Sequence, residues 1–119
     1  MKHRVIIALG SNCRQSAHIR WASERLSFLL ADCRLSRTLW TADIKGSGKW
    51  YINRLAAGYT ELSVDDLQQL LKQTEAEAGR TKDTVTIDLD LLQYDDRRYH
   101  ERDWQRPYVT SILNDITSV

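Results

Sequence analysis

The stretch of residues 84–94, TVTIDLDLLQY, alternates apolar and polar side chains along most of its length. Apolar residues occupy every second position on one side of an extended chain, at Val85, Ile87, Leu89 and Leu91. The opposite side carries Asp88 and Asp90, although Asp is among the residues that strands tolerate least. The pattern predicts a strand with one apolar face, which must lie in a sheet and pack against another layer.

The rest of the chain supplies further strands and two helices. Strands are predicted at residues 4–9, 35–41 and 50–60, and helical spacing of apolar residues covers residues 16–32. A second helix is marked by Ser63, which forms a capping-box pattern with Asp66, and by Gly79 at its end. This order predicts one domain, residues 1–119, with an α+β ferredoxin-like antiparallel sheet and helices packed on one face.

Composition excludes several classes of function. A net charge of +1 with evenly spread basic residues gives no footprint for nucleic acid, and the mixed run at residues 95–103 is predicted to be a solvated loop. Cys13 and Cys33 lie in no metal-binding spacing, so reduced thiols and a cytoplasmic location are expected. The N-terminal apolar run is too short for a signal peptide, and no stretch approaches the roughly 20 apolar residues of a membrane span.

The acidic pair suggests a site for divalent cations. Same-face neighbours on a strand lie roughly 7 Å apart, so the carboxylates of Asp88 and Asp90 can face a shared site. Unpaired, they repel each other, and a cation removes that conflict. Mg²⁺ is the natural ligand because it prefers one or two carboxylates and completes its shell with waters and phosphates. The alternative is that both side chains simply point into solvent, since a lone D-x-D motif is a weak signal.

Three other motifs are ambiguous by themselves. The GSGK segment at residues 46–49 lacks the flanking residues of a phosphate-binding P-loop, so a flexible loop is predicted. GSN at residues 10–12 is either an anion-binding turn or a plain strand-to-helix turn. Tyr51 and Asn53 share a strand face, where a ring beside an amide can read a flat heterocycle or can be an ordinary surface pair.

Charged residues elsewhere allow two interpretations. Glu75 and Arg80 flank the end of the second predicted helix, where they either form local ion pairs or, in the case of Arg80, face phosphate charge. The three histidines show no ligand-like grouping and are predicted to lie on the surface.

Taken in order, these weak motifs resemble the hydroxymethyl-dihydropterin pyrophosphokinase family. The resemblance covers about residues 4–116 and rests on the segments ALGSN (8–12), Thr41, YIN (51–53), EAEAGR (75–80), TIDLDLL (86–92) and RPYVTSILNDI (106–116). It implies a ferredoxin-like fold and transfer of pyrophosphate from ATP to the hydroxymethyl group of a reduced pterin, with release of AMP.

The resemblance also implies roles for individual residues. Arg80, Asp88 and Asp90 would be catalytic, and the two aspartates would hold two Mg²⁺ ions against the ATP phosphates. The pterin pocket would be lined by Thr41, Tyr51, Asn53 and Tyr108, with Tyr108 in a position where the family usually has Phe. ATP would be bound by Glu75, Leu91 and Arg106, and the loop at residues 43–49 would close over the substrates.

The sequence departs from the family pattern near the phosphates. Val85 stands where family members typically have Arg, the segment after Arg80 is short with Lys82 as its one basic residue, and the proline–histidine motif before Arg106 is absent. These departures motivate an alternative, a non-catalytic relative that binds a pterin-like molecule. A small ferredoxin-like RNA-binding or interaction module is a third alternative, which the lack of basic–aromatic strands disfavours.

Overall fold

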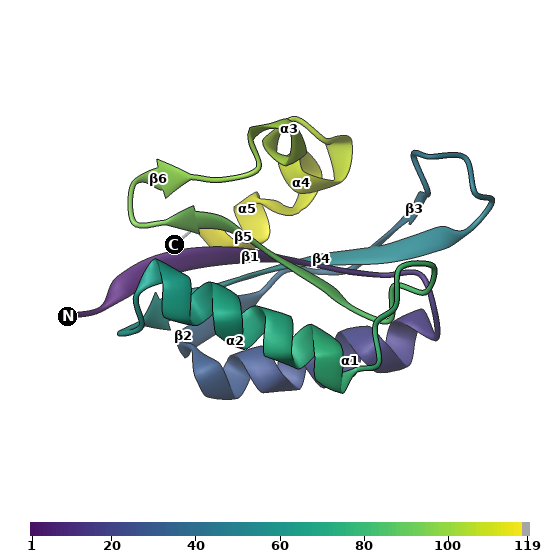
Figure 1. Ribbon diagram of the computed structural model, residues 1–119. Coiled ribbons are helices and arrows are strands. Elements are labelled where there is room, and N and C mark those ends of the chain that lie inside the picture. The colour runs from purple at the N-terminus through teal and green to yellow at the C-terminus, as the bar shows by residue number, and fades with distance from the viewer. Residues whose placement is uncertain (118–119) are drawn as a thin grey trace.

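The computed structural model describes residues 1–117, which form one antiparallel sheet covered by helices on both faces (Figure 1). The strands are β1 (His3–Ser11), β2 (Ala31–Leu35), β3 (Leu39–Ala42), β4 (Trp50–Thr60), β5 (Asp88–Tyr94) and β6 (Arg97–Arg98). Their order is β2-β4-β1-β5-β6, with β3 also paired to β4. The central pairs are antiparallel, and the predicted α+β ferredoxin-like class is confirmed.

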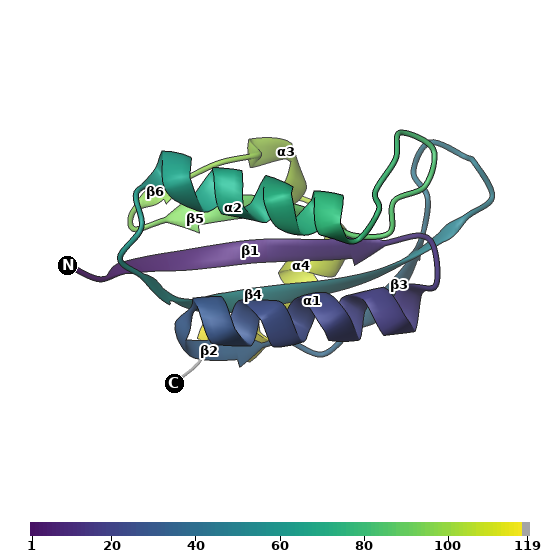
Figure 2. The same cartoon turned by 60° about the horizontal axis from the view of Figure 1, so that its bottom comes forward.

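Two long helices lie side by side on one face of the sheet, α1 (Gln15–Leu29) and α2 (Val64–Glu77) (Figure 2). The predicted N-cap of α2 is confirmed, because the Ser63 side chain accepts the Asp66 N–H at 3.2 Å. Gly79 follows the helix in a left-handed conformation, which a residue without Cβ adopts most easily. The core on this face contains Val5, Ile7, Leu9, Ile19, Leu26, Ile52, Leu67, Leu71, Ile87, Leu89 and Leu91.

Three short helices cover the opposite face: α3 (Glu101–Trp104), α4 (Pro107–Ile112) and α5 (Asn114–Thr117) (Figure 1). They bury a second apolar cluster formed by Ile6, Ala8, Leu55, Ala57, Leu92, Trp104, Val109, Ile112 and Ile116. The Trp104 indole N–H donates to the carbonyls of Leu92, at 3.2 Å, and Tyr99, at 3.1 Å. These bonds attach α3 to β5 and to the residue that follows β6, and helices on this second face were not predicted from the sequence.

Two predicted strands have different bounds in the structure. The segment predicted at 35–41 is two strands, because the chain leaves β4 at Ser36 and pairs with it again from Leu39. Ser36 stabilises this break by accepting the Leu55 N–H through its hydroxyl at 2.8 Å. The strand predicted from residue 84 begins only at Asp88, since the main chain of Val85 bonds to Asn12 instead of continuing the ladder.

Two other boundaries were also wrong. The helix predicted to residue 32 ends at Leu29, because Ala31 already pairs with Tyr59 in β2. The run at residues 95–103, predicted to be a loop, contains β6 and α3. No helix in the described part of the chain is both long and apolar enough to cross a membrane. Cys13 and Cys33 are free thiols.

Candidate active site

The acidic pair lies on β5, on the face covered by the C-terminal helices. Asp90 stands opposite Ala8 of β1, and Asp88 stands opposite Gly10. Because side chains alternate along a strand, both carboxylates point away from the α1–α2 core, and both line a cavity of about 420 Å³. The two side chains are still 34% (Asp88) and 33% (Asp90) exposed, so the cavity that they line is open to solvent.

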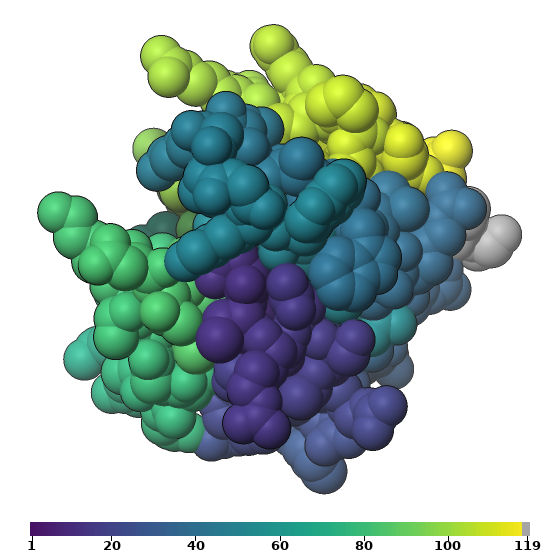
Figure 3. All heavy atoms as spheres, turned by 90° about the vertical axis from the view of Figure 1, so that its right-hand side faces the viewer, coloured from purple at the N-terminus to yellow at the C-terminus, as the bar shows by residue number. Residues whose placement is uncertain are grey.

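The cavity is built from segments far apart in the sequence. Its walls come from the C-terminal half of β1, from β3 with the loop that follows it, from β4, from β5 and from the α3–α4 region. Figure 3 looks onto the end of the molecule where the segments at residues 10–15, 43–49 and 80–87 meet. Seven of the ten residues predicted from the family resemblance line the cavity: Thr41, Tyr51, Asn53, Asp88, Asp90, Arg106 and Tyr108.

One wall of the cavity combines the Tyr51 ring with the Asn53 amide and the Thr41 hydroxyl. Thr41 is paired with Tyr51 across the β3–β4 ladder, and Asn53 lies two residues further along β4. The Asn53 amide donates to the Thr41 hydroxyl at 2.7 Å and is buried. This bond fixes the Asn53 amide in the wall, where it can read the edge of a flat polar ring.

Asn12 ties this wall to the segment that precedes β5. Its side-chain oxygen accepts the Val85 N–H at 2.9 Å, and its own N–H donates to the Val85 carbonyl at 2.9 Å. Its amide nitrogen donates to the Tyr51 hydroxyl at 3.2 Å. The Asn12 amide groups are therefore used inside the protein, which favours a structural turn over an anion-binding turn for the GSN motif.

Burial and repulsion act together on the acidic pair. Desolvation, followed by the nearby negative charge of Asp88, raises the pKa of Asp90 from its usual 3.8 to about 7. A divalent cation would relieve this repulsion, so the two carboxylates fit Mg²⁺ by their chemistry. Among residues 1–117 no three acidic, His or Cys side chains are grouped to hold a metal alone. Mg²⁺ tolerates such a sparse site when waters and phosphates complete its shell.

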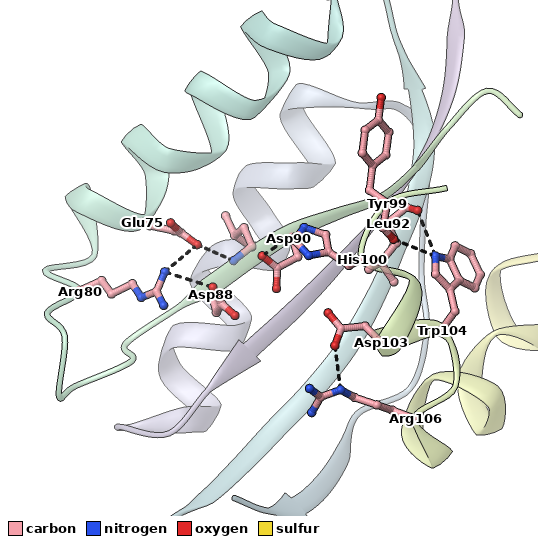
Figure 4. Close-up of polar contacts among 11 residues, drawn as sticks. Glu75, Arg80, Asp88, Asp90, Leu92, Tyr99, His100, Asp103, Trp104 and Arg106 are labelled. Carbon is pink, nitrogen blue, oxygen red and sulfur yellow. Dashed lines mark hydrogen bonds and ion pairs between the residues drawn. The ribbon is translucent and has the colours of Figure 1, made fainter. Parts of the chain in front are cut away.

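Arg80 already contacts one member of the pair. Its guanidinium lies 3.1 Å from Asp88 and 3.3 Å from Glu75, as Figure 4 shows. Glu75 in turn accepts the Leu89 N–H at 2.7 Å, and burial is the main cause that raises its pKa. The local ion pair predicted for Glu75 and Arg80 does form. Arg80 also pairs with Asp88, so it contacts the candidate site as well.

The third wall comes from α3 and α4. Asp103 and Arg106 form an ion pair at 2.7 Å (Figure 4). Both residues line the cavity, as does Tyr108. Burial, with a smaller contribution from the Asp103 charge, raises the pKa of Tyr108 to about 12, so its hydroxyl stays protonated. Tyr108 is therefore neutral, and it lines the same cavity as Thr41, Tyr51 and Asn53.

Two predicted ATP-binding residues lie outside the cavity. The Leu91 side chain is 2% exposed in the α1–α2 core, so a role in binding ATP would have to come from its main chain. Within residues 1–117, β6 pairs with β5 at Gln93 and Tyr94 and does not extend to Leu91. Glu75 does not line the cavity; it pairs with Arg80 and accepts the Leu89 N–H.

Sequence reasoning missed several side chains at this site. Lys45 and Ile44 line the cavity from the 43–49 loop, and Asp103 lines it from α3. His100, predicted as a surface residue, is 46% exposed but places Nε2 4.0 Å from Asp90. The buried Thr86 hydroxyl, two residues before Asp88, has no hydrogen-bond partner in the described chain. Of these side chains, only Thr86 could have been found from the sequence, because it lies on the same face of its segment as Asp88 and Asp90.

The Asp90 environment makes a prediction about stability. Between pH 4 and 7 the folded chain holds a proton on Asp90 that the unfolded chain has lost, so raising the pH through this window lowers the free energy of unfolding. At pH 8, Asp90→Asn is expected to be more stable than wild type by about 2 kcal/mol, a value reduced for the side chain's partial exposure. Denaturant unfolding of both proteins at pH 4 and pH 8 measures this. A wild-type-to-variant difference that is the same at both pH values would contradict it.

Fold and cavity together define the class of protein: a small ferredoxin-like α+β domain whose cleft places paired carboxylates and basic groups beside an aromatic, amide-bearing wall. The family model for 7,8-dihydro-6-hydroxymethylpterin-pyrophosphokinase matches residues 6–118. The chain belongs to this family.

Two plant proteins are similar to the chain. A folate synthesis bifunctional protein of Arabidopsis thaliana is 32% identical over 79 residues, covering 56% of this chain and 16% of that protein. A mitochondrial folate synthesis bifunctional protein from the same organism is 31% identical over 131 residues, covering 97% of this chain and 24% of that protein. The chain thus spans about a quarter or less of the length of these relatives.

Proposed function

We propose that this protein transfers the pyrophosphoryl group of ATP to the hydroxymethyl oxygen of 6-hydroxymethyl-7,8-dihydropterin and releases AMP, a step of folate synthesis. Family membership supports the reaction, and the observation that carries it is the convergence of seven predicted residues on one cavity. The names of the two plant relatives support the same pathway.

Each wall of the cavity has a part in the proposed reaction. The pterin ring would lie between the Thr41–Asn53 wall and the Tyr108 ring, with the Asn53 amide at its polar edge. Its hydroxymethyl oxygen would then face the acidic pair. The new bond joins this oxygen to the β-phosphorus, the bond from the β-phosphorus to the α–β bridging oxygen breaks, and the hydroxyl proton is released. Such a transfer depends on alignment and charge neutralisation more than on covalent chemistry.

Charge neutralisation would come from cations on several segments. Asp88 and Asp90 would hold Mg²⁺, which supplies positive charge at the phosphates. Arg80, Arg106 and Lys45 would add fixed positive charge around the same anion. Arg80 contacts Asp88 at 3.1 Å, so it is in place to meet a phosphate bound there.

One experiment tests the activity directly. The protein is incubated with ATP, Mg²⁺ and 6-hydroxymethyl-7,8-dihydropterin, and AMP and the pyrophosphorylated pterin are measured by chromatography. Both products are expected in equal amounts, with no product when Mg²⁺ is chelated. Absence of AMP at high protein concentration would overturn the proposed transfer.

A non-catalytic pterin binder is the second candidate, favoured by the apolar Val85 where the family typically has Arg. Calorimetry separates the two functions. Pterin binding with no Mg²⁺-dependent ATP binding supports the binder, whereas Mg²⁺-dependent binding of ATP supports the enzyme. The cytoplasmic location expected from the sequence remains a prediction, and the name of one relative specifies mitochondria for that protein.

Asn12 allows a test of how the pterin wall is held. Asn12→Ala removes the bonds to Val85 N–H and to the Tyr51 hydroxyl, each worth about 1 kcal/mol. We expect the KM for the pterin to rise about tenfold, with a smaller change in kcat, because the Tyr51 ring loses its anchor. Gln15→Ala is the matched control, since it removes an exposed bond to the Trp50 carbonyl. Equal effects of the two substitutions on KM would contradict this role for Asn12.

A further inference from the structure

A second cavity, of about 470 Å³, lies on the α1 side of the sheet. Helix α1 forms one side, and β2, the connection to β3, and β4 form the other. Strand β4 separates this cavity from the candidate active site, because neighbouring side chains on a strand point to opposite faces. Asn53 faces the active site and Arg54 faces this second cavity.

Arg54 is a charged residue on a face of β4 whose neighbouring side chains are apolar. Ile52 and Ala56, which share its face of β4, belong to the α1–α2 core. The Arg54 Nε donates to the Ser36 carbonyl at 2.6 Å, and Nη1 donates to the Ser23 hydroxyl at 3.2 Å. Both acceptors are neutral. Within residues 1–117, no carboxylate oxygen lies within 4.0 Å of this guanidinium.

The charge of Arg54 is therefore only partly compensated. The two bonds use two of the five guanidinium N–H donors and bring no negative charge. Partial burial lowers the pKa of Arg54, as expected for a cation removed from water without an anionic partner. The Cys33 thiol, whose own pKa is raised by burial, interacts with Arg54 electrostatically. A desolvated cation without a counter-charge is unfavourable, and an anion bound beside it would remove the conflict.

The remaining walls restrict the kind of anion. Ile19, Leu35 and Ile52 make part of the lining apolar, and Phe28, 90% exposed, stands at the rim. The other charged lining residues are Arg20 and Glu24, which carry opposite charges, so the lining has a net charge of one positive unit. One uncompensated positive charge with apolar walls suits a monoanion that carries an apolar group, and a planar guanidinium matches a carboxylate.

We propose that the α1–β4 cavity is a binding site for a small carboxylate with an apolar body, whose carboxylate pairs with the free guanidinium donors of Arg54. This site is separate from the candidate active site and does not depend on the proposed function. The apolar part of the ligand lies against Ile19 and Leu35, and the exposed Phe28 ring is placed to cover it.

The test uses the full chain and NMR titrations with three probes: benzoate, its neutral isostere benzamide, and inorganic phosphate. Benzoate is expected to shift the amide signals around Ser23, Leu35 and Arg54, and benzamide is expected to bind at least tenfold more weakly. Phosphate, which has no apolar part, is expected to bind more weakly than benzoate. Equal binding of benzoate and benzamide, tighter binding of phosphate, or shifts confined to the Tyr51–Asp88 cavity would overturn the proposal.

Substitutions at Arg54 supply the second arm. Arg54→Gln is expected to weaken benzoate binding at least tenfold, and Arg20→Gln, the rim control, less than twofold. Because Arg54→Gln also removes the bond to Ser36 and can disturb folding, Arg54→Lys is tested in parallel. Lysine keeps the positive charge but lacks the planar pair of N–H donors of the guanidinium, so benzoate binding at least threefold weaker than wild type is expected. The NMR spectrum of Arg54→Lys is expected to remain that of a folded protein. Unchanged binding in Arg54→Lys and in any folded Arg54→Gln would overturn the proposal.

Discussion

Replacing Asp88 by Asn is expected to lower kcat for AMP formation about a thousandfold while leaving the protein folded. The substitution preserves the shape of the side chain but removes the charge that pairs with Arg80 at 3.1 Å and that would hold Mg²⁺. Loss of one preorganised electrostatic group at a reacting phosphate raises a barrier by roughly 3–4 kcal/mol, which corresponds to a factor of about 10²–10³. Loss of the metal at the same position adds to this effect.

Two measurements distinguish this effect from a general loss of structure. Calorimetry should show that Asp88→Asn loses Mg²⁺-dependent ATP binding while pterin affinity changes less than threefold, because Thr41, Tyr51 and Asn53, the residues proposed to bind the pterin, lie on β3 and β4. Asp96→Asn, an exposed change just after β5, is the control and should retain full activity. A kcat within tenfold of wild type in Asp88→Asn would show that the acidic pair does not carry the reaction.

Replacing Trp104 by Ala is expected to lower the free energy of unfolding by about 3–5 kcal/mol. Trp104 is 8% exposed, fills the cluster between the sheet and the C-terminal helices, and lies under the Arg98 guanidinium at 4.1 Å. A domain of this size is usually stable by about 5–15 kcal/mol, so the change removes a large fraction of the total. Urea unfolding followed by circular dichroism measures it.

The same substitution should also impair the site. Trp104 is the neighbour of Asp103 on α3, and the ion pair of Asp103 with Arg106 forms one wall of the cavity. Trp104→Phe is the control: it keeps an aromatic ring but loses the donor to Leu92 and Tyr99, and should destabilise the fold by about 1–3 kcal/mol. A loss below 1 kcal/mol in Trp104→Ala would mean that the C-terminal helices contribute little to the fold.

The sequence predicted the architecture because periodicity reports which face of an element is buried. The alternation in β5, the capping of α2 by Ser63 and the order of elements were sufficient for the α+β ferredoxin-like class. The sequence-based prediction of strand and helix ends was wrong where a single tertiary contact overrides the local conformational preference. The Asn12–Val85 pairing, which delays the start of β5 to Asp88, joins residues 73 positions apart.

The residues of the candidate site were likewise predicted only in part. Family resemblance indicated Asp88, Asp90, Asn53 and Tyr108, and these residues do share a cavity. It could not show that Leu91 points into the core while Asp103 and Lys45 reach the cavity. The short helix α3 places Asp103 and the loop at residues 43–49 places Lys45, and neither segment has a long apolar period that would predict its position.

By itself, the sequence determined the type of each long element, the face on which the two carboxylates lie and the family to compare. Only the tertiary structure decided that those carboxylates share a cavity with residues of α3 and α4, that burial raises the pKa of Asp90 to about 7, and that Arg80 reaches Asp88. The physical reason is the sequence separation over which each interaction acts. Periodicity is set by the local backbone, whereas desolvation and ion pairing depend on side chains that the sequence separates and the fold brings together.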